Sequence, residues 1–209
     1  SASVERIGRE KRRIAFRAAM SRGFKALHAE KFGKARSAFE QAEELDSNAP
    51  EVKAALKQVV NEEASFKIER YLGKAQQAER AEQWNKAAAN YASALKIDPR
   101  LSTASAAKRI ADMRHRLNVQ LIAYIARPQR LSTTAVYDEA NRILDNAHTI
   151  SSPGKVLRRQ IADLARALTL ARTPVDINLQ SDNLTIVTIY RIGTLGSFDI
   201  REVSLLPGQ

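Results

Sequence analysis

The stretch "WNKAAANYASALKIDP", residues 84–99, decides the fold of this chain because its pattern of residues occurs three times. The pattern begins with an aromatic residue, followed by an alanine, a second large residue, another alanine, an apolar residue and a closing Pro or Ser. The successive offsets between these six positions are three, four, three, three and two residues. The same offsets occur in "FGKARSAFEQAEELDS" (32–47) and in "YDEANRILDNAHTISS" (137–152). Internal repetition of this kind predicts an array of helical units.

The residue types explain how such units pack. Ala87 and Ala94 let a neighbouring backbone approach closely, while Trp84 and Tyr91 fill the space between units. The order resembles the second helix of the tetratricopeptide repeat family, which carries an aromatic, Ala, aromatic, Ala and Pro. This resemblance implies pairs of antiparallel helices and a groove that binds a peptide. The third copy departs from the family pattern at Leu144 and Ser152.

The repeat spacing is longer than the family's. Phe39 to Tyr91 is 52 residues and Tyr91 to Leu144 is 53, whereas tetratricopeptide units recur at about 34. The intervening segments are apolar at helical spacing, so each is predicted to be one long helix. The predicted fold is therefore mostly α, an α-solenoid of alternating short and long antiparallel helices over residues 1–172.

The predicted helices span residues 3–30, 33–46, 50–80, 84–97, 100–127, 132–149 and 153–171. Gly73 is expected to be a weak point of the third helix because glycine has a low helix propensity. Ser152 is expected to cap the last helix, with Pro153 at its first position.

Residues 173–209 have a different composition, with β-branched runs separated by turn residues such as "QSDN" and "RIGTLGS". They predict a small antiparallel β segment. This segment resembles the start of a PEGA-type domain, which implies a protein of the bacterial cell envelope whose β-domain continues past Gln209. We expect residues 174–206 to form one sheet that packs on the last helix through Val175, Ile177 and Ile186, or that borrows a strand from another copy in a homo-oligomer.

The formal net charge is +11, and much of the excess lies at the start of the chain. Residues 1–30 hold eight Lys or Arg against three Glu. Two interpretations are open. The cluster Arg9, Lys11, Arg12, Arg13 and Arg17 binds an anionic polymer, lipid or nucleic acid, or it is the solvated face of a helix that turns Ile7, Ile14, Ala18 and Phe24 inward. Nucleic acid is disfavoured because aromatic residues for base stacking are not visible.

Enzymatic chemistry is not indicated. The chain has no Cys, which excludes disulfides, thiolate metal sites and a cysteine nucleophile. His28, His115 and His148 lie apart from one another, so neither a metal site nor a cofactor or small-molecule substrate is predicted. The longest apolar run, residues 117–126, is too short to cross a bilayer.

The predicted function is a protein–protein interaction scaffold that binds a peptide or partner helix in its groove. Phe24, His28, Gln76 and Arg80 are expected to line the groove, although Phe24 equally suits the core. The family's carboxylate clamp of Lys and Asn is replaced by Met20, Phe24, Leu72 and Gln76. The alternative function is a basic surface module acting through the N-terminal helix. The PEGA resemblance favours the extracytoplasmic side of an anchored envelope protein over the cytoplasm.

Overall fold

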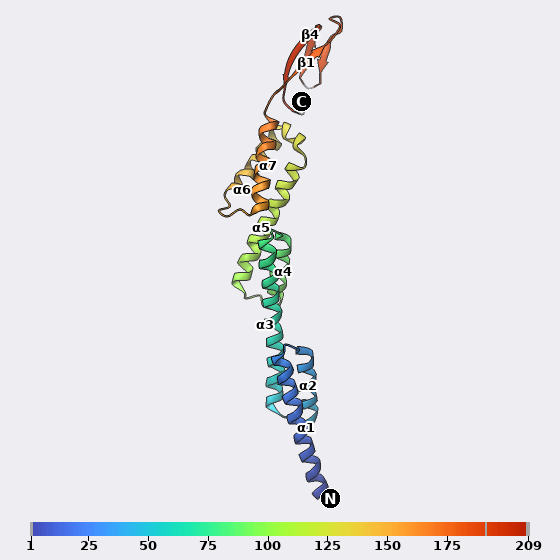
Figure 1. Ribbon diagram of the computed structural model, residues 1–209, viewed down its shortest axis with the longest axis vertical. Helices are drawn as coiled ribbons and strands as arrows, with labels where there is room; N and C mark the ends of the chain where they lie inside the picture. The colour runs from blue at the N-terminus through green and yellow to red at the C-terminus, as the bar shows by residue number, and fades with distance from the viewer. Residues whose placement is uncertain (1, 191, 208–209) are drawn as a thin grey trace. The chain divides into compact units, whose positions relative to one another are not determined.

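A computed structural model describes residues 2–190 and 192–207 of the chain. The described part is mostly α-helical and ends in a small antiparallel β segment (Figure 1). The helices are α1 (Ala2–His28), α2 (Phe32–Leu45), α3 (Pro50–Arg80), α4 (Trp84–Ile97), α5 (Ser102–Ile125), α6 (Thr134–His148) and α7 (Lys155–Ala171).

The long helices predicted from the repeat spacing are confirmed. The bounds of α3 and α4 agree with the prediction, and α3 continues through Gly73 without a break. The segment before α6 differs, because a 3-10 helix, η1 (Pro128–Ser132), precedes α6. Pro128 suits the start of a separate helical turn because its ring fixes φ and it has no N–H to leave unbonded.

The chain divides into two compact units. One comprises Ser1–Gln77 and Ala89–Lys108, and the other comprises Ala78–Ala88 and Arg109–Gln209.

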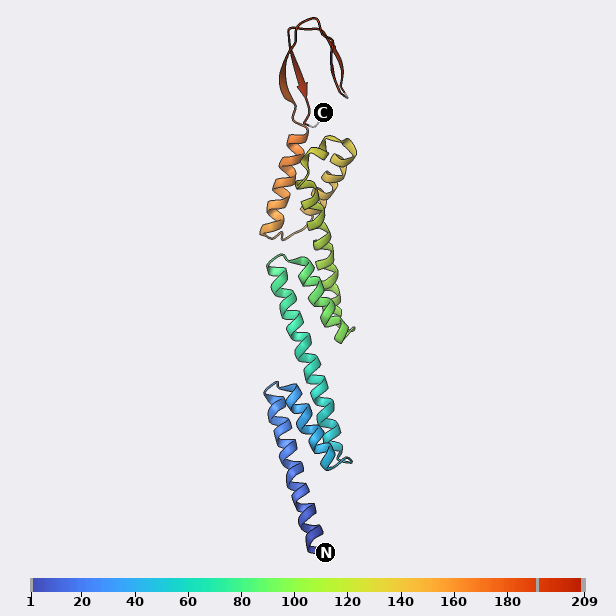
Figure 2. The same ribbon diagram turned by 90° about the vertical axis from the view of Figure 1, so that its right-hand side faces the viewer.

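The core of the first unit lies between α1, α2 and the first half of α3, which run side by side in both views (Figures 1 and 2). Phe39 of α2 is its largest fully buried side chain. Gly23 of α1 lies against the Phe39 ring so closely that an added Cβ would collide with it. The other buried members are Ala19, Leu27, Ala35, Ala42, Ala49, Val52, Ala55 and Val59.

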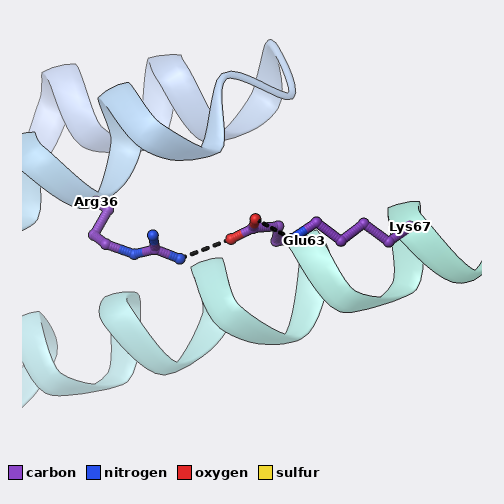
Figure 3. Close-up of polar contacts among 3 residues, drawn as sticks. All are labelled: Arg36, Glu63 and Lys67. Atoms are coloured by element: carbon purple, nitrogen blue, oxygen red, sulfur yellow. Dashed lines mark hydrogen bonds and ion pairs between the residues drawn. The ribbon is translucent and has the colours of Figure 1, made fainter. Parts of the chain in front are cut away.

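A charged contact joins α2 to α3 in this unit (Figure 3). Arg36 donates from Nη2 to Glu63 Oε2 at 2.7 Å, and Lys67 donates from Nζ to Glu63 Oε1 at 2.6 Å. These hydrogen bonds, with that from Lys67 the stronger, lower the pKa of the Glu63 carboxyl below its ordinary 4.5. The contact therefore favours the ionised carboxylate.

The core of the second unit lies between the second half of α5, η1, α6 and α7. Leu121, Leu131 and Leu164 are fully buried there. Around them pack Ala140, Ile143, Ala147, Leu157, Leu168 and Ala171. α7 contributes Leu157, Leu164, Leu168 and Ala171 to this core, and these residues lie on one face of the helix because they recur at helical spacing.

Both alanines of each repeat copy are buried, as the close-packing argument requires. They are Ala35 and Ala42, Ala87 and Ala94, and Ala140 and Ala147. The second large residue of the pattern is buried in the first two copies, as Phe39 and Tyr91, and half-buried in the third, as Leu144.

The prediction of which α1 residues face the core is wrong. Ile7, Ile14 and Ala18 are exposed, and α1 contributes Ala19, Gly23 and Leu27 to the core instead. These three residues recur every four positions and so share one face of the helix. The apolar residues near the start of α1 lie on another face.

The β segment consists of two separate pairs of strands. β1 (Val175–Gln180) pairs with β4 (Ile200–Leu205), and β2 (Val187–Ile189) pairs with β3 (Gly193–Gly196), both antiparallel. The residues "GTLG", expected to be part of a turn, form β3. The expected packing on the last helix through Val175, Ile177 and Ile186 is wrong, since all three side chains are exposed.

Candidate functional site

The four residues predicted to line a groove do not line the hollows described below. Phe24 contacts Phe39 edge to face, with 5.0 Å between ring centroids, so it belongs partly to the core of the first unit. His28, in the last turn of α1, is exposed, as are Gln76 and Arg80 on α3. Their predicted role stays a prediction.

A groove does lie between α5 and α7 in the second unit. Two adjoining hollows, of about 430 and 380 Å³, share Ile125 and Asp163 in their walls. The floor is apolar and comprises Ile122, Ile125, Ala126, Val156, Ala167 and Leu170. Large apolar side chains left open to solvent along one groove are typical of a surface that contacts another protein.

The groove residues of α7 occupy a single face of that helix. Val156, Asp163 and Leu170 are spaced by seven residues. Arg159 lies about one turn from Val156 and from Asp163, and Arg166 lies about one turn from Asp163 and from Leu170. From Val156 to Leu170 the helix rises by roughly 21 Å at 1.5 Å per residue. The groove therefore offers the length of about four helical turns to a partner.

The rim of the groove is basic. Lys155, Arg159 and Arg166 line it and are all exposed, and Asp163 is the acidic residue among the lining side chains. Arg159 Nε lies 3.7 Å from Asp163 Oδ2, so that carboxylate is already neutralised in part. The rim thus leaves a surplus of positive charge beside an apolar floor, which suits an acidic partner.

The start of α7 is held by a residue from a distant part of the chain. Glu82, in the turn between α3 and α4, accepts hydrogen bonds from the backbone N–H of Val156, at 2.6 Å, and of Leu157, at 3.1 Å. A carboxylate satisfies free N–H groups at a helix N-terminus and is stabilised by the helix dipole. The sequence-based expectation of Ser152 as N-cap is wrong, because α7 begins at Lys155 with Gly154 before it.

Two backbone features allow this contact. Glu82 has a positive φ of 53°, which few non-glycine residues adopt. At Gly154 a Cβ would collide with the Glu82 carboxylate.

Glu30, in the turn between α1 and α2, has a φ of 56° and the same pair of turn hydrogen bonds. The repeated "AE" before Phe32 and before Trp84 is the sequence signal that could have identified this turn.

Arg114 of α5 lies beside the same contact. Only 7% of it is exposed, and its guanidinium lies 4.7 Å from the centre of the Trp84 ring. Burial lowers the pKa of Arg114, while the nearby Glu82 carboxylate opposes that shift. The Arg114 Nη1 atom has no hydrogen-bond partner among the described residues. The cation–π contact and the carboxylate thus offset part of the cost of burying this charge.

A further hydrogen bond connects the two walls of the groove. Gln160 of α7 donates from Nε2 to Asn118 Oδ1 of α5 at 2.7 Å. Together with the Glu82 cap and the shared leucine core, it fixes α7 relative to α5. The groove is therefore held in shape by packing and hydrogen bonds of the unit itself.

A third hollow, of about 490 Å³, lies beside the end of α5 and the start of α6. Its charged lining residues, Arg127, Arg130 and Glu139, carry opposite signs, and Glu139 also pairs with Arg142. Its apolar lining residues are Ala123, Tyr124, Ala135 and Val136, none of which is a large, exposed apolar side chain like Ile122, Val156 and Leu170 of the α5–α7 groove. We therefore take the α5–α7 groove as the candidate functional site.

The predicted basic cluster of α1 is exposed throughout. Arg13 pairs with Glu10 at 2.7 Å. Arg9, Arg12 and Arg13 also line a shallow hollow with Phe16, Leu45 and Asp46 at the end of α2. Positive charge near the C-terminal end of α2 is favourable because of the helix dipole.

Within residues 2–190 and 192–207, no group of three or more His, Asp or Glu side chains is placed to hold a metal ion. None of the helices in this described part is both long and apolar enough to span a membrane. Comparisons with models of protein families, with curated proteins and with solved structures found no match.

Proposed function

We propose that this chain is a non-enzymatic interaction scaffold that binds one helix of a partner protein in the α5–α7 groove. The observation that carries the proposal is the apolar floor between α5 and α7, where Ile122, Val156 and Leu170 are open to solvent. A helix laid in such a groove buries apolar residues at positions i, i+3, i+4 and i+7.

The partner helix is acidic and amphipathic. Lys155, Arg159 and Arg166 complement glutamates and aspartates that flank its apolar stripe. The available length accommodates about four turns. Rim charges affect mainly the association rate and its salt dependence, whereas the floor residues contribute most of the affinity.

The resemblance of the sequence repeat to the tetratricopeptide family supports this proposal. In that family the first helix of each pair faces the groove, and the repeat pattern assigns α5 to that position in the third copy. Gln129, which lines the groove, lies 53 residues after Gln76, which in turn lies 52 residues after Phe24. By this spacing, Gln129 of η1 is the counterpart in the third repeat of Phe24 and Gln76, two of the residues that the resemblance suggested for the groove.

The cellular setting is part of the proposal and rests on the β segment. The sequence of this segment resembles the start of a PEGA-type domain, which favours an anchored protein on the outer side of the bacterial cytoplasmic membrane. The exposed Ile177 and Ile200 lie on the β1–β4 pair and remain available to a further strand or a second copy.

A synthetic peptide tests the groove. The probe is a fluorescein-labelled helix of about four turns with leucines along one face and glutamates elsewhere. Its matched control has the same composition with the leucines dispersed around the helix. Fluorescence anisotropy should detect binding of the first peptide and much weaker binding of the second. Equal affinity for both peptides would contradict the proposal.

Two variants on one helix sharpen this test. Ile122 in the groove and Ile110 outside it are both on α5 and are 49% and 53% exposed. Ile122→Asp should weaken peptide binding by roughly tenfold or more, because a charge enters the apolar contact. Ile110→Asp should leave the affinity unchanged. Equal losses in the two variants would indicate that the peptide does not bind in the groove.

A further inference from the structure

We propose that the first half of α1 lies in the surface of an anionic lipid membrane. Three apolar side chains, Val4, Ile7 and Ile14, are 72%, 53% and 60% exposed there. This surface belongs to the first compact unit, whereas the α5–α7 groove belongs to the second. The inference therefore goes beyond the proposed binding of a partner helix.

The exposed apolar residues are not an extension of the core face. At 100° per residue, Ile14 lies roughly 180° around the helix from Gly23, and Ile7 lies roughly 160° from it. Gly23 is the residue that packs against Phe39 in the core. The same helix thus has two apolar faces, and α2 and α3 cover only the one that carries Ala19, Gly23 and Leu27.

The second apolar face extends over residues 4–18 of the helix. Val4, Ile7, Ile14 and Ala18 lie within roughly 80° of one another on a helical projection, with Ala15 beside them. The face contains one charged residue, Lys11, whose long side chain can place its ammonium at headgroup level. Such a stripe on a helix rich in arginine is typical of helices that lie in the membrane interface.

The positive charge of this part of α1 favours an anionic lipid surface as the binding partner of the apolar stripe. Residues 2–19 carry six Lys or Arg and two Glu, a surplus of four positive charges. Arg6 and Arg17 lie roughly 60° to 80° from Ile14 on one side of the stripe, with Glu10 between them and Ile14. Arg12 lies on the face that carries Ala19 and Gly23. Anionic headgroups attract basic residues placed beside an inserted apolar face. A second copy of α1 would instead bring like charges together along the same stripe.

The apolar stripe also distinguishes lipid from nucleic acid. Polyanion binding requires the arginines but gains nothing from the exposed isoleucines. Base stacking requires exposed aromatic rings, and Phe16, the aromatic residue in this half of α1, is half-buried against the core.

Vesicle flotation of the full chain tests the proposal. The probes are vesicles of phosphatidylcholine alone and of phosphatidylcholine mixed equally with phosphatidylglycerol. We expect binding to the mixed vesicles and little binding to the neutral ones. The pair Ile7→Ser and Ile14→Ser should reduce binding by roughly tenfold or more, since it removes the inserted side chains and no charge. The matched control, Val60→Ser, changes a 55% exposed side chain on α3 and should have no effect.

The absence of Cys permits a second readout that does not depend on affinity. A nitroxide on Ile7→Cys should enter a lipid-like environment with mixed vesicles, as measured by oxygen accessibility in electron paramagnetic resonance. A nitroxide on Val60→Cys should stay in water. Insertion at position 7 with loss of binding in the serine pair would support the proposal.

Three outcomes would overturn it. Unchanged binding by the serine pair would mean that charge alone attracts the chain, as for a polyanion such as RNA. A label at position 7 that stays in water would exclude insertion. Dimerisation without lipid that the serine pair abolishes, as measured by sedimentation equilibrium, would assign the stripe to a second copy of the chain.

Discussion

Gly23 has a packing role that Gly8, the other glycine of α1, does not share. Its Cα lies against the Phe39 ring, where an added methyl group would collide, whereas Gly8 has open space around it. In a helix interior, glycine otherwise costs about 1 kcal/mol relative to alanine. The two positions therefore separate packing from helix propensity.

We predict that Gly23→Ala lowers the free energy of unfolding by roughly 1 to 3 kcal/mol, because the packed core must shift. Gly8→Ala is the control in the same helix and should leave stability unchanged or raise it slightly. Chemical denaturation measures both. A Gly23→Ala chain as stable as the Gly8→Ala chain would contradict the assigned contact between α1 and α2.

The alanines of the repeat are predicted to be as sensitive as this glycine. Ala87 is fully buried on α4, and Ala89 on the same helix is exposed. Ala87→Arg should lower the free energy of unfolding by roughly 2 to 4 kcal/mol, because a charge enters a close-packed site. Ala89→Arg should have little effect. Equal melting temperatures of the two variants would remove the repeat interpretation at its best-supported copy.

At the scale of the element, α7 depends on a turn far away in sequence. Glu82 supplies acceptors for two N–H groups of α7, and Glu30 has the same backbone conformation in the equivalent turn. We predict that Glu82→Ala costs about 1 to 2 kcal/mol of unfolding free energy, as the loss of a helix cap does. Thermal unfolding monitored by circular dichroism measures this cost.

The matched control for the cap is Glu30→Ala, which changes the same residue type at the same φ. Its effect should be smaller than that of Glu82→Ala. Amide exchange gives an independent readout, since the N–H groups of Val156 and Leu157 should lose protection in Glu82→Ala alone. Retained protection there would show that the carboxylate does not hold the start of α7.

The attachment of α2 to α3 depends on pH through Glu63. Its pKa is lowered in the folded chain, mainly by the hydrogen bond from Lys67, so its contribution is present above the ordinary value of 4.5 and is lost as pH falls through the lower folded pKa. The wild-type chain should exceed Glu63→Gln in stability by about 1 kcal/mol or less at neutral pH, since the partners are partly exposed. The difference should shrink in acid, and a constant difference would contradict this assignment.

The helices could be predicted because each carries its own periodicity and stop signals. The bounds of α3 and α4 followed from the apolar pattern and from the turns before Pro50 and Pro99. The cap of α7 could not be predicted, because its acceptor lies 74 residues before Val156. In α1, two apolar faces compete, and only the tertiary contact of Gly23 with Phe39 decides which one is buried.

At the scale of the whole molecule, the mostly helical fold with a small β segment was predicted, whereas the residues of the α5–α7 groove were not. The predicted groove of helical repeats stays a prediction. Phe24 was also considered for the core, and its contact with Phe39 supports that alternative. The groove residues Ile122, Val156 and Leu170 were missed, because an exposed apolar residue on a helix cannot be distinguished from a core residue without knowing its neighbours.

The central claim is that a partner helix binds between α5 and α7, and amide chemical-shift mapping tests it most directly. The isotopically labelled chain is titrated with the acidic amphipathic peptide in a nuclear magnetic resonance experiment. We predict that the largest shifts occur at Ile122, Ile125, Val156 and Leu170. Shifts concentrated instead at Phe24, His28, Gln76 and Arg80, or no localised shifts at all, would contradict the claim.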